Sequence, residues 1–311
     1  MTASPKSPDP RMRDVLGRAL GSGAPLVSLI GFPCDEGVTR NAGRPGAAAG
    51  PDAIRQAFAR LTPDAESPEA FLHVAERTAD LGDIEITGDL ERDQERLGQT
   101  IAPLLAGEGM VIVIGGGHET AYGHFLGYVG AKMPVRIVNW DAHCDVREPV
   151  DGRGSSGTPF RQALEHPSRM ATRYCVAGVQ PHSAAGSHVA FVAQRGEVVW
   201  RRDVTRATIL HLYGSNDTPM MASFDLDALD RAHAPGVSAP NSGGLPVSLW
   251  LEAAYRAGAA PNIRSADIVE LNPSLDRDGQ TAALAALTVW SLLKGVSDRL
   301  AGAGRPPATA T

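Results

Sequence analysis

Residues 135–145, VRIVNWDAHCD, join a short apolar run to a cluster of acidic and histidine side chains. The run is rich in Val and Ile, which is typical of a strand buried on both faces of a parallel sheet. Asp141, His143 and Asp145 follow it at every second position. Because extended backbone sends alternate side chains to one face, we expect these three to converge while Cys144 points into the core.

Further apolar runs of the same kind are each followed by a glycine-rich or polar loop, at 25–32, 110–117, 174–179, 220–227 and 266–273. Amphipathic or Ala-rich stretches that are typical of helices lie between the runs, at 50–60, 89–106, 119–130, 247–258 and 280–300. Strands that alternate with helices indicate a doubly wound α/β sheet. Such sheets bind ligands at the carboxyl ends of their strands, so the polar residues found there form the candidate site.

No long linker, repeat or break in composition divides the chain. We therefore expect a single domain over residues 1–311, with disordered ends at about 1–12 and 302–311, where Pro, Ala, Ser and Thr predominate. A chain of 311 residues buries enough surface to fold without disulfides or a structural metal. We therefore expect a bound metal to have a catalytic role and not a structural one.

Charge and composition exclude several classes of protein. The net charge of -6 and the absence of a long basic run disfavour nucleic-acid binding. No apolar stretch is long enough to span a membrane, and the N-terminus lacks the apolar core of a signal peptide. The 3 cysteines form no CxxC pair, which fits a reducing compartment. We expect a cytoplasmic protein that acts on a small molecule.

Two more segments place metal-type ligands directly after an apolar run, GGGHE (115–119) and SFDLD (223–227). The complete set has four carboxylates and two imidazoles, namely His118, Asp141, His143, Asp145, Asp225 and Asp227. One catalytic zinc takes fewer protein ligands, and crowded carboxylates at apolar strand ends repel each other without cations. We therefore expect two divalent ions. The mixed oxygen and imidazole ligands favour Mn²⁺ and leave Zn²⁺, Co²⁺ or Fe²⁺ open.

These motifs resemble the ureohydrolase family, which comprises arginases, agmatinases and formimidoylglutamases. The family pattern GG-x-H, DAHxD, SxDxDxxD and DxxExNP corresponds in the same order to GGGHE, DAHCD, SFDLDALD and DIVELNP (267–273). The resemblance spans about residues 25–300. It implies an arginase-like fold, a three-layer α/β/α sandwich around a mostly parallel sheet of about eight strands. It also implies two Mn²⁺ ions per subunit and a homo-oligomer, either a trimer or a hexamer.

The resemblance also implies a role for each candidate residue. One ion would be bound by His118 and Asp145, and the other by His143 and Asp227. Asp141 and Asp225 would bridge the two ions. Asp145 would in addition accept a proton from the attacking water and pass it to the leaving nitrogen. Glu270, in the last motif, would bind the guanidinium or amidinium of the substrate.

Several details favour formimidoylglutamase within the family. GGGHE, the segment 34–51, Arg147 and SSGTPFRQ (155–162) resemble that group, whereas arginases more often have GGDHS. Arginases also have a histidine in the loop that corresponds to 151–162, and this chain has none there. The implied reaction converts N-formimidoyl-L-glutamate and water to L-glutamate and formamide, a step of histidine degradation. The substrate's two carboxylates require cationic partners, and we expect Arg147 and Arg161 to bind them.

Three alternatives stay open at the level of the sequence. The first is another amidinohydrolase, namely agmatinase, guanidinobutyrase or arginase. The second is a mononuclear zinc deacetylase of related fold, which would not need His118, Asp145 and Asp227 together. The third is an inactive paralogue, against which the intact set of six ligands argues. Of the histidines outside the ligand set, His124 is expected to be packed or to cap a helix, and His188 to be structural or on the surface.

Overall fold

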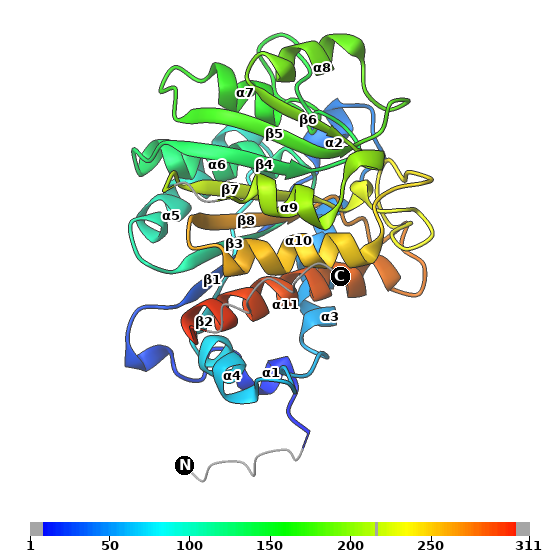
Figure 1. The fold of residues 1–311 in the computed structure, drawn as a ribbon. Helices are drawn as coiled ribbons and strands as arrows, with labels where there is room; N and C mark the ends of the chain where they lie inside the picture. The colour runs from blue at the N-terminus through cyan, green and yellow to red at the C-terminus, as the bar shows by residue number, and fades with distance from the viewer. Residues whose placement is uncertain (1–8, 215–216, 303–311) are drawn as a thin grey trace.

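The structure is a computed structural model that describes residues 9–214 and 217–302. Its centre is an eight-stranded sheet whose paired strands all run parallel, in the order β2-β1-β3-β8-β7-β4-β5-β6. Figure 1 shows the strands stacked from β6 at the top to β2 at the bottom. Their bounds are β1 Val27–Phe32, β2 Thr78–Asp83, β3 Met110–Gly115, β4 Val135–Trp140, β5 Ala171–Val179, β6 Gly196–Trp200, β7 Met220–Asp225 and β8 Ile263–Val269.

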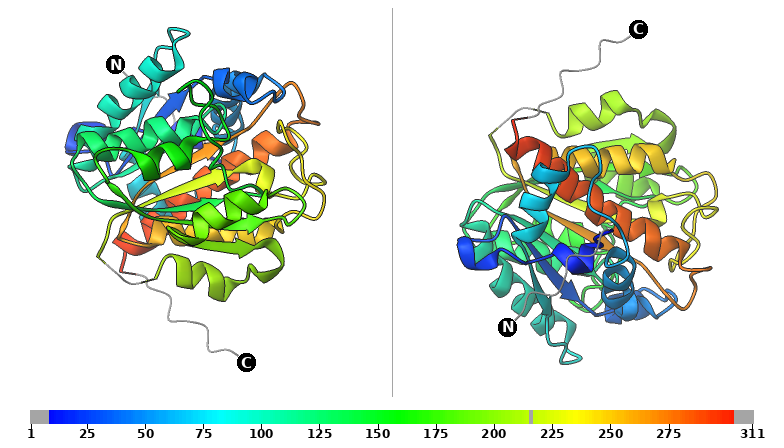
Figure 2. Two further views of the ribbon diagram at one scale, coloured as in Figure 1. Left: turned by 90° about the horizontal axis from the view of Figure 1, so that it is seen from above. Right: turned by 90° about the horizontal axis from the view of Figure 1, so that it is seen from below.

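Helices cover both faces of this sheet, and Figure 2 shows the resulting layers from above and below. One layer, in front in Figure 1, contains α3 (Gly50–Phe58), α4 (Pro68–Glu76), α9 (Arg206–Leu212), α10 (Val247–Ala259) and α11 (Gln280–Leu300). The other contains α5 (Leu90–Leu105), α6 (Thr120–Gly130), α7 (Pro159–Glu165) and α8 (Gly186–Ala193). The short helices α1 (Met12–Val15) and α2 (Glu36–Arg40) complete the fold. The expected three-layer α/β/α sandwich around a parallel sheet is therefore confirmed.

Each face of the sheet has its own apolar core. Ile112 and Ile114 of β3 pack into the core beneath α10 and α11, whereas Val111 and Val113 pack into the core beneath α5 and α6. All residues of β3 are buried. A strand that is apolar at successive positions is therefore covered on both faces, as its sequence indicated. Neither edge strand, β2 nor β6, was among the predicted apolar runs.

The predicted disordered ends of the domain can be compared with the structure only in part. Met12 is fully buried and begins α1, where we expected the disordered N-terminal segment to end. Residues 1–8 and 303–311 of the predicted disordered ends lie outside the described residues. We propose a single domain because all eight strands join one sheet. Within 9–214 and 217–302, no helix is both long and apolar enough to cross a bilayer.

Candidate metal centre

Four adjacent central strands deliver the predicted ligands to one edge of the sheet. In the order β3-β8-β7-β4, His118 follows the first strand, Glu270 the second, Asp225 ends the third and Asp141 follows the fourth. In a parallel sheet the carboxyl ends of neighbouring strands meet at the same edge. Residues more than 100 positions apart in the sequence therefore lie within contact distance of one another.

The first group of ligands gathers around the ring of His118. Its Nδ1 atom lies 2.8 Å from Asp145 Oδ2, 2.9 Å from Asp225 Oδ2 and 3.4 Å from Asp141 Oδ2. His118, Asp141 and Asp225 are buried, and Asp145 is partly buried. One nitrogen and three carboxylate oxygens therefore surround a single point at the strand ends, an arrangement that suits a divalent cation.

The second group shares Asp141 with the first. The Nδ1 atom of His143 lies 3.3 Å from Asp141 Oδ1 and 3.0 Å from Asp227 Oδ2. Asp141 therefore turns one oxygen to each group, as the bridging role predicted for it requires, and that role stays a prediction. Asp225 turns Oδ2 to the first group, while its Oδ1 accepts the backbone N–H of Asp227 at 2.8 Å. Its expected bridging role stays a prediction.

The six side chains converge, but the expected reason for this convergence was wrong. Extended backbone ends at Trp140, and the segment that follows is a loop in which Asp145 has a left-handed φ of 46°. Asp225 still belongs to β7, whereas Asp227 lies in the 3₁₀ helix Leu226–Ala228. Turns, and not extended backbone, therefore orient the side chains of Asp145 and Asp227 toward the cluster. The hydrogen bonds from the backbone N–H groups of His143 and Asp227 to the preceding carboxylates hold the turns in place.

Burial and repulsion oppose the ionisation of Asp225 and Asp227 when no cation is present. Burial raises the pKa of Asp225 well above its ordinary value, and the charges of Asp227 and Asp141 raise it further. Burial also raises the pKa of Asp227 to about 6. The charge of Asp227 in turn raises the pKa of His143. Cations at this position would replace the protons that the groups otherwise retain.

Two buried atoms test whether a metal fits. In the described part of the chain, buried His118 Nδ1 lies close to three carboxylate oxygens but in hydrogen-bonding geometry with none of them, and buried Asp227 Oδ1 has no hydrogen-bond partner. Unsatisfied polar atoms in a protein interior are costly, and metal ligation satisfies them. Imidazole and carboxylate donors together suit Mn²⁺ and similar ions. The residues present therefore fit a two-metal centre.

A cavity of about 360 Å³ opens beside the ligands and is lined by His143, Asp145, Asp225, Asp227 and Glu270 among others. Glu270 follows β8 with a left-handed φ of 72°, and its Oε1 atom accepts the backbone N–H of His118 at 2.7 Å. Burial raises the pKa of Glu270 to about 8, with Glu119 and Asp227 contributing repulsion. A buried carboxyl group of this kind favours a cationic partner.

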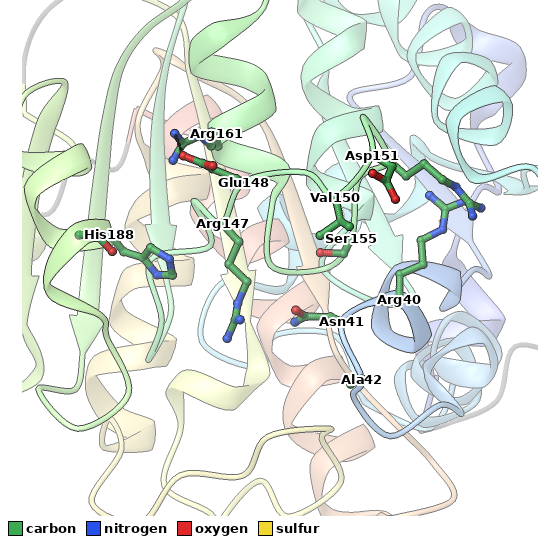
Figure 3. A pocket seen from close by; sticks show the side chains of 12 residues that line it. Arg40, Asn41, Ala42, Arg147, Glu148, Val150, Asp151, Ser155, Arg161 and His188 are labelled. Atoms are coloured by element: carbon green, nitrogen blue, oxygen red, sulfur yellow. Dashed lines mark hydrogen bonds and ion pairs between the residues drawn. The ribbon is translucent and has the colours of Figure 1, made fainter.

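A wider cavity of about 700 Å³ continues outward, and the two cavities share Asn41, Ala42, Arg147 and His188 in their walls. Figure 3 shows Arg147 reaching between His188 and Asn41, whereas Arg161 lies beside Glu148 at the back. Arg161 pairs with Glu148 at 2.8 Å and stacks on Phe191. The guanidinium of Arg147 has no hydrogen-bond or ion-pair partner among the described residues. Of the two predicted substrate-binding arginines, Arg147 alone lines both cavities.

Several polar residues of the pocket were not predicted as site residues, among them Asn41, Ser156, Ser183, His188 and Ser238. His188 was expected to be structural or on the surface, but it lines both cavities from α8. Apart from His188, these residues lie in short polar loops that have no periodic signal, so only the fold shows that they line the pocket. Cys144 is buried in the core as expected, and burial raises the pKa of its thiol to about 12, which excludes a thiolate nucleophile at neutral pH.

The chain belongs to the arginase family, whose model matches residues 26–294. Among its relatives is the formimidoylglutamase of Chromobacterium violaceum, 38% identical over 286 residues that cover 87% of this chain and 88% of the relative. The formimidoylglutamase of Nocardia farcinica is 40% identical over 276 residues, which cover 85% of each chain.

Solved structures agree with this assignment. A structure of Trypanosoma cruzi formiminoglutamase with Mn²⁺ superposes with a TM-score of 0.84 at 31% identity, covering 94% of this chain and 99% of the other. Bacillus subtilis arginase superposes with a TM-score of 0.70 at 26% identity, covering 86% and 98%. The expected membership of the arginase and agmatinase group is thus confirmed.

Proposed function

We propose that this chain is a formimidoylglutamase, which hydrolyses N-formimidoyl-L-glutamate to L-glutamate and formamide. The observation that carries the proposal is one pocket that combines the two ligand groups, the buried Glu270 and the unpaired Arg147. These provide a centre for hydrolysis, a carboxylate for an amidinium, and a cation for a carboxylate. The relatives named above have the same activity in their names and match over most of both chains.

The two ions are proposed to be Mn²⁺, held by His118, Asp141, His143, Asp145, Asp225 and Asp227. The manganese in the Trypanosoma cruzi structure and the donor types support this choice. When bound, paired divalent ions supply Lewis acidity that lowers the pKa of a shared water molecule toward neutrality.

The protein's own groups then position the substrate and move protons. Glu270 is fixed on one side by the backbone of His118, and its Oε2 is proposed to bind the amidinium and hold the reacting carbon beside the metal centre. Asp145 lines the cavity and is partly buried. It is proposed to accept the proton of the attacking water and deliver it to the leaving nitrogen.

The carboxylates of the substrate distinguish this reaction from related ones. Arg147 is proposed to bind one of them at the junction of the two cavities. Arg161 stays a predicted substrate ligand, with the difference that Glu148, Glu165 and the carbonyl of Val146 already engage its guanidinium. Agmatine has no carboxylate, so an agmatinase would not require Arg147.

The setting of the enzyme is proposed by the same reasoning. Its three free cysteines are all buried, which suits a reducing cytoplasm, and its reaction would belong to histidine degradation. The family resemblance supports a homo-oligomer, a trimer or a hexamer. Neither nucleic acid nor a membrane is proposed as a partner.

A substrate panel tests the proposal. Purified protein loaded with Mn²⁺ is assayed with N-formimidoyl-L-glutamate, agmatine, 4-guanidinobutyrate and arginine. We expect turnover of the first compound to exceed that of the others by orders of magnitude. Activity confined to a guanidino compound would contradict the substrate and leave the metal centre standing. Substitution of Asp141 by Asn, as a matched control, is expected to abolish turnover of any substrate.

A further inference from the structure

A continuous chain of buried hydrogen bonds leads from His118 away from the cavity and into the layer between the sheet and α6. The Nε2 atom of His118 lies 3.0 Å from Ser223 Oγ, and Ser223 donates to Asp267 Oδ1 at 2.5 Å. The other oxygen of Asp267 lies 2.7 Å from Nδ1 of His124. All four side chains are at most 1% exposed, so water does not substitute for these contacts.

The chain continues beyond His124 to the protein backbone. The Nε2 atom of His124 lies 2.6 Å from Ser265 Oγ, which lies 2.6 Å from the hydroxyl of Tyr128. That hydroxyl donates to the carbonyl of Met220 at 3.2 Å. Every polar side-chain atom along this route therefore has a partner, and the far end is anchored to β7.

The fold brings these residues together in a simple way. His124 and Tyr128 lie one turn apart on α6, so both point at the same part of the sheet. Ser265 and Asp267 alternate along β8 and share a face. The register of β7 against β8 pairs Ser223 directly with Asp267. Apart from His118, which lies in the turn between β3 and α6, the chain of contacts is thus built from three secondary-structure elements.

The direction of the hydrogen bonds follows from the role of His118. A neutral imidazole carries a proton on only one nitrogen, so if Nδ1 binds a cation, Nε2 must be the donor. Ser223 then accepts from His118 and donates onward to Asp267. Asp267 accepts twice and, among the described residues, has no donors other than Ser223 and His124. Without His124, one oxygen of a fully buried carboxylate would have no partner.

We propose that His124 is a positioning residue for His118. Acting through Asp267 and Ser223, it fixes the ring orientation and the tautomer that present Nδ1 to the cation. This inference rests on the proposed function, because it requires His118 to be a metal ligand. Outer contacts of this kind orient metal-binding histidines, and their loss typically costs about 10- to 100-fold in metal affinity.

Two conservative substitutions separate positioning from mere packing. His124→Asn places an amide nitrogen where Nδ1 stands and keeps the donor to Asp267. His124→Gln places its amide where Nε2 stands and keeps the contact with Ser265 only. We expect the Asn variant to bind both ions nearly as the unaltered protein does. We expect the Gln variant to lose about tenfold in affinity for one of the two ions.

The measurement is a titration of the metal-free full-length protein with Mn²⁺, followed by calorimetry and by the electron paramagnetic resonance of free Mn²⁺. Ser223→Ala removes the middle of the chain and is expected to weaken the same single ion, so a folding failure at position 124 does not end the test. Thr288→Val is the matched control, since it breaks a buried hydrogen bond to Trp250 in the opposite layer and should leave both affinities unchanged.

The outcomes are distinct. If the unaltered protein binds no Mn²⁺, the proposed function itself fails. If it binds two ions and the Gln and Ser223→Ala variants do the same with unchanged affinity, the positioning role is overturned. Equal losses at both ions in both variants at position 124 would also overturn it, because packing alone would then explain the effect. The proposal is supported if His124→Gln loses affinity for one of the two Mn²⁺ ions and His124→Asn keeps it.

Discussion

Five arginines lie near the candidate site, Arg40 in α2, Arg161 in α7 and the other three in loops, and they differ in the groups that bind their side chains. Arg40 pairs with Glu91 and Glu36, Arg44 donates to the carbonyls of Val237 and Ser238, and Arg161 pairs with Glu148. Arg153 is largely exposed and lies 3.9 Å from Glu36. A guanidinium already bound to a carboxylate gains less from a new one, so the free group of Arg147 is the strongest candidate for the substrate.

Substitution of Arg147 by Gln should raise KM for N-formimidoyl-L-glutamate by roughly 10- to 100-fold, the value of one charge-assisted contact. The metal content should not change, because Arg147 belongs to neither ligand group. Steady-state kinetics and metal analysis would measure both. Arg161→Gln serves as the comparison and should lower thermal stability more than it raises KM. Equal increases in KM for the two variants would restore Arg161 as a direct substrate ligand.

At the same scale, the sequence predicted which residues meet but not how they meet. Alternation along a strand explains neither Asp145, which has a positive φ, nor Asp227, which lies in a 3₁₀ helix. His188 was missed because nothing in the sequence near α8 indicates which surface that helix borders. The types of residue thus predict the chemistry of the site. The geometry of its turns and the contacts between distant segments become known only from the fold.

At the scale of the elements, a contact joins the turn after β3 to helix α2 beside the cavity. Glu119, next to the proposed ligand His118, is fully buried, and its Oε1 accepts the backbone N–H of Gly37 in α2 at 2.8 Å. The cavity residues Asn41 and Ala42 follow α2 directly. The Glu of GGGHE, which distinguished this chain from arginases in the sequence, therefore ties the metal loop to the wall of the substrate pocket.

A methyl group at Gly37 should disturb this contact. A Cβ atom there would lie 2.5 Å from Glu119 Cδ and 2.7 Å from its Oε2, closer than van der Waals contact allows. Gly37→Ala should therefore displace α2 and lower kcat/KM by up to about 100-fold, as misplaced binding groups do. Mn²⁺ affinity should change much less. Gly21→Ala, with no atom within 4 Å of the added carbon, is the control. Unaltered kinetics in Gly37→Ala would show that this contact does not shape the cavity.

The central strands were predictable and the edge strands were not, for a physical reason. A central strand such as β3 is buried on both faces and must be apolar at successive positions. The last four residues of β2 are exposed, and in β6 only Val199 is buried, so polar residues suffice there. The helices α5 and α10 each bury one apolar stripe, whereas α6 and α11 are buried around most of their surface, and all four have the amphipathic or Ala-rich sequence from which helices were predicted.

At the scale of the whole molecule, the metal centre lies at the junction of separate parts of the chain. The proposed ligands lie at or just after the ends of β3, β4 and β7, and Glu270 follows β8. Four carboxylates therefore repel one another across the centre of the sheet unless cations neutralise them. Binding to the folded state alone stabilises a protein by about 2.7 kcal/mol when the free ligand is at 100 times Kd. Metal binding and folding should consequently be linked.

Removal of Mn²⁺ by a chelator should lower Tm by several degrees, because about 1 kcal/mol corresponds to roughly 2–4 °C in a large domain. Calorimetric scans with and without excess Mn²⁺ would measure this shift. Asp225→Asn is the matched variant, since its amide oxygen can still accept the N–H of Asp227, while the variant removes a carboxyl group whose ionisation burial and repulsion oppose. Its Tm without metal should equal or exceed that of the unaltered protein, and its response to Mn²⁺ should be much smaller. If the Tm of the unaltered protein does not change with Mn²⁺, the repulsion between these carboxylates is relieved by some means other than bound cations.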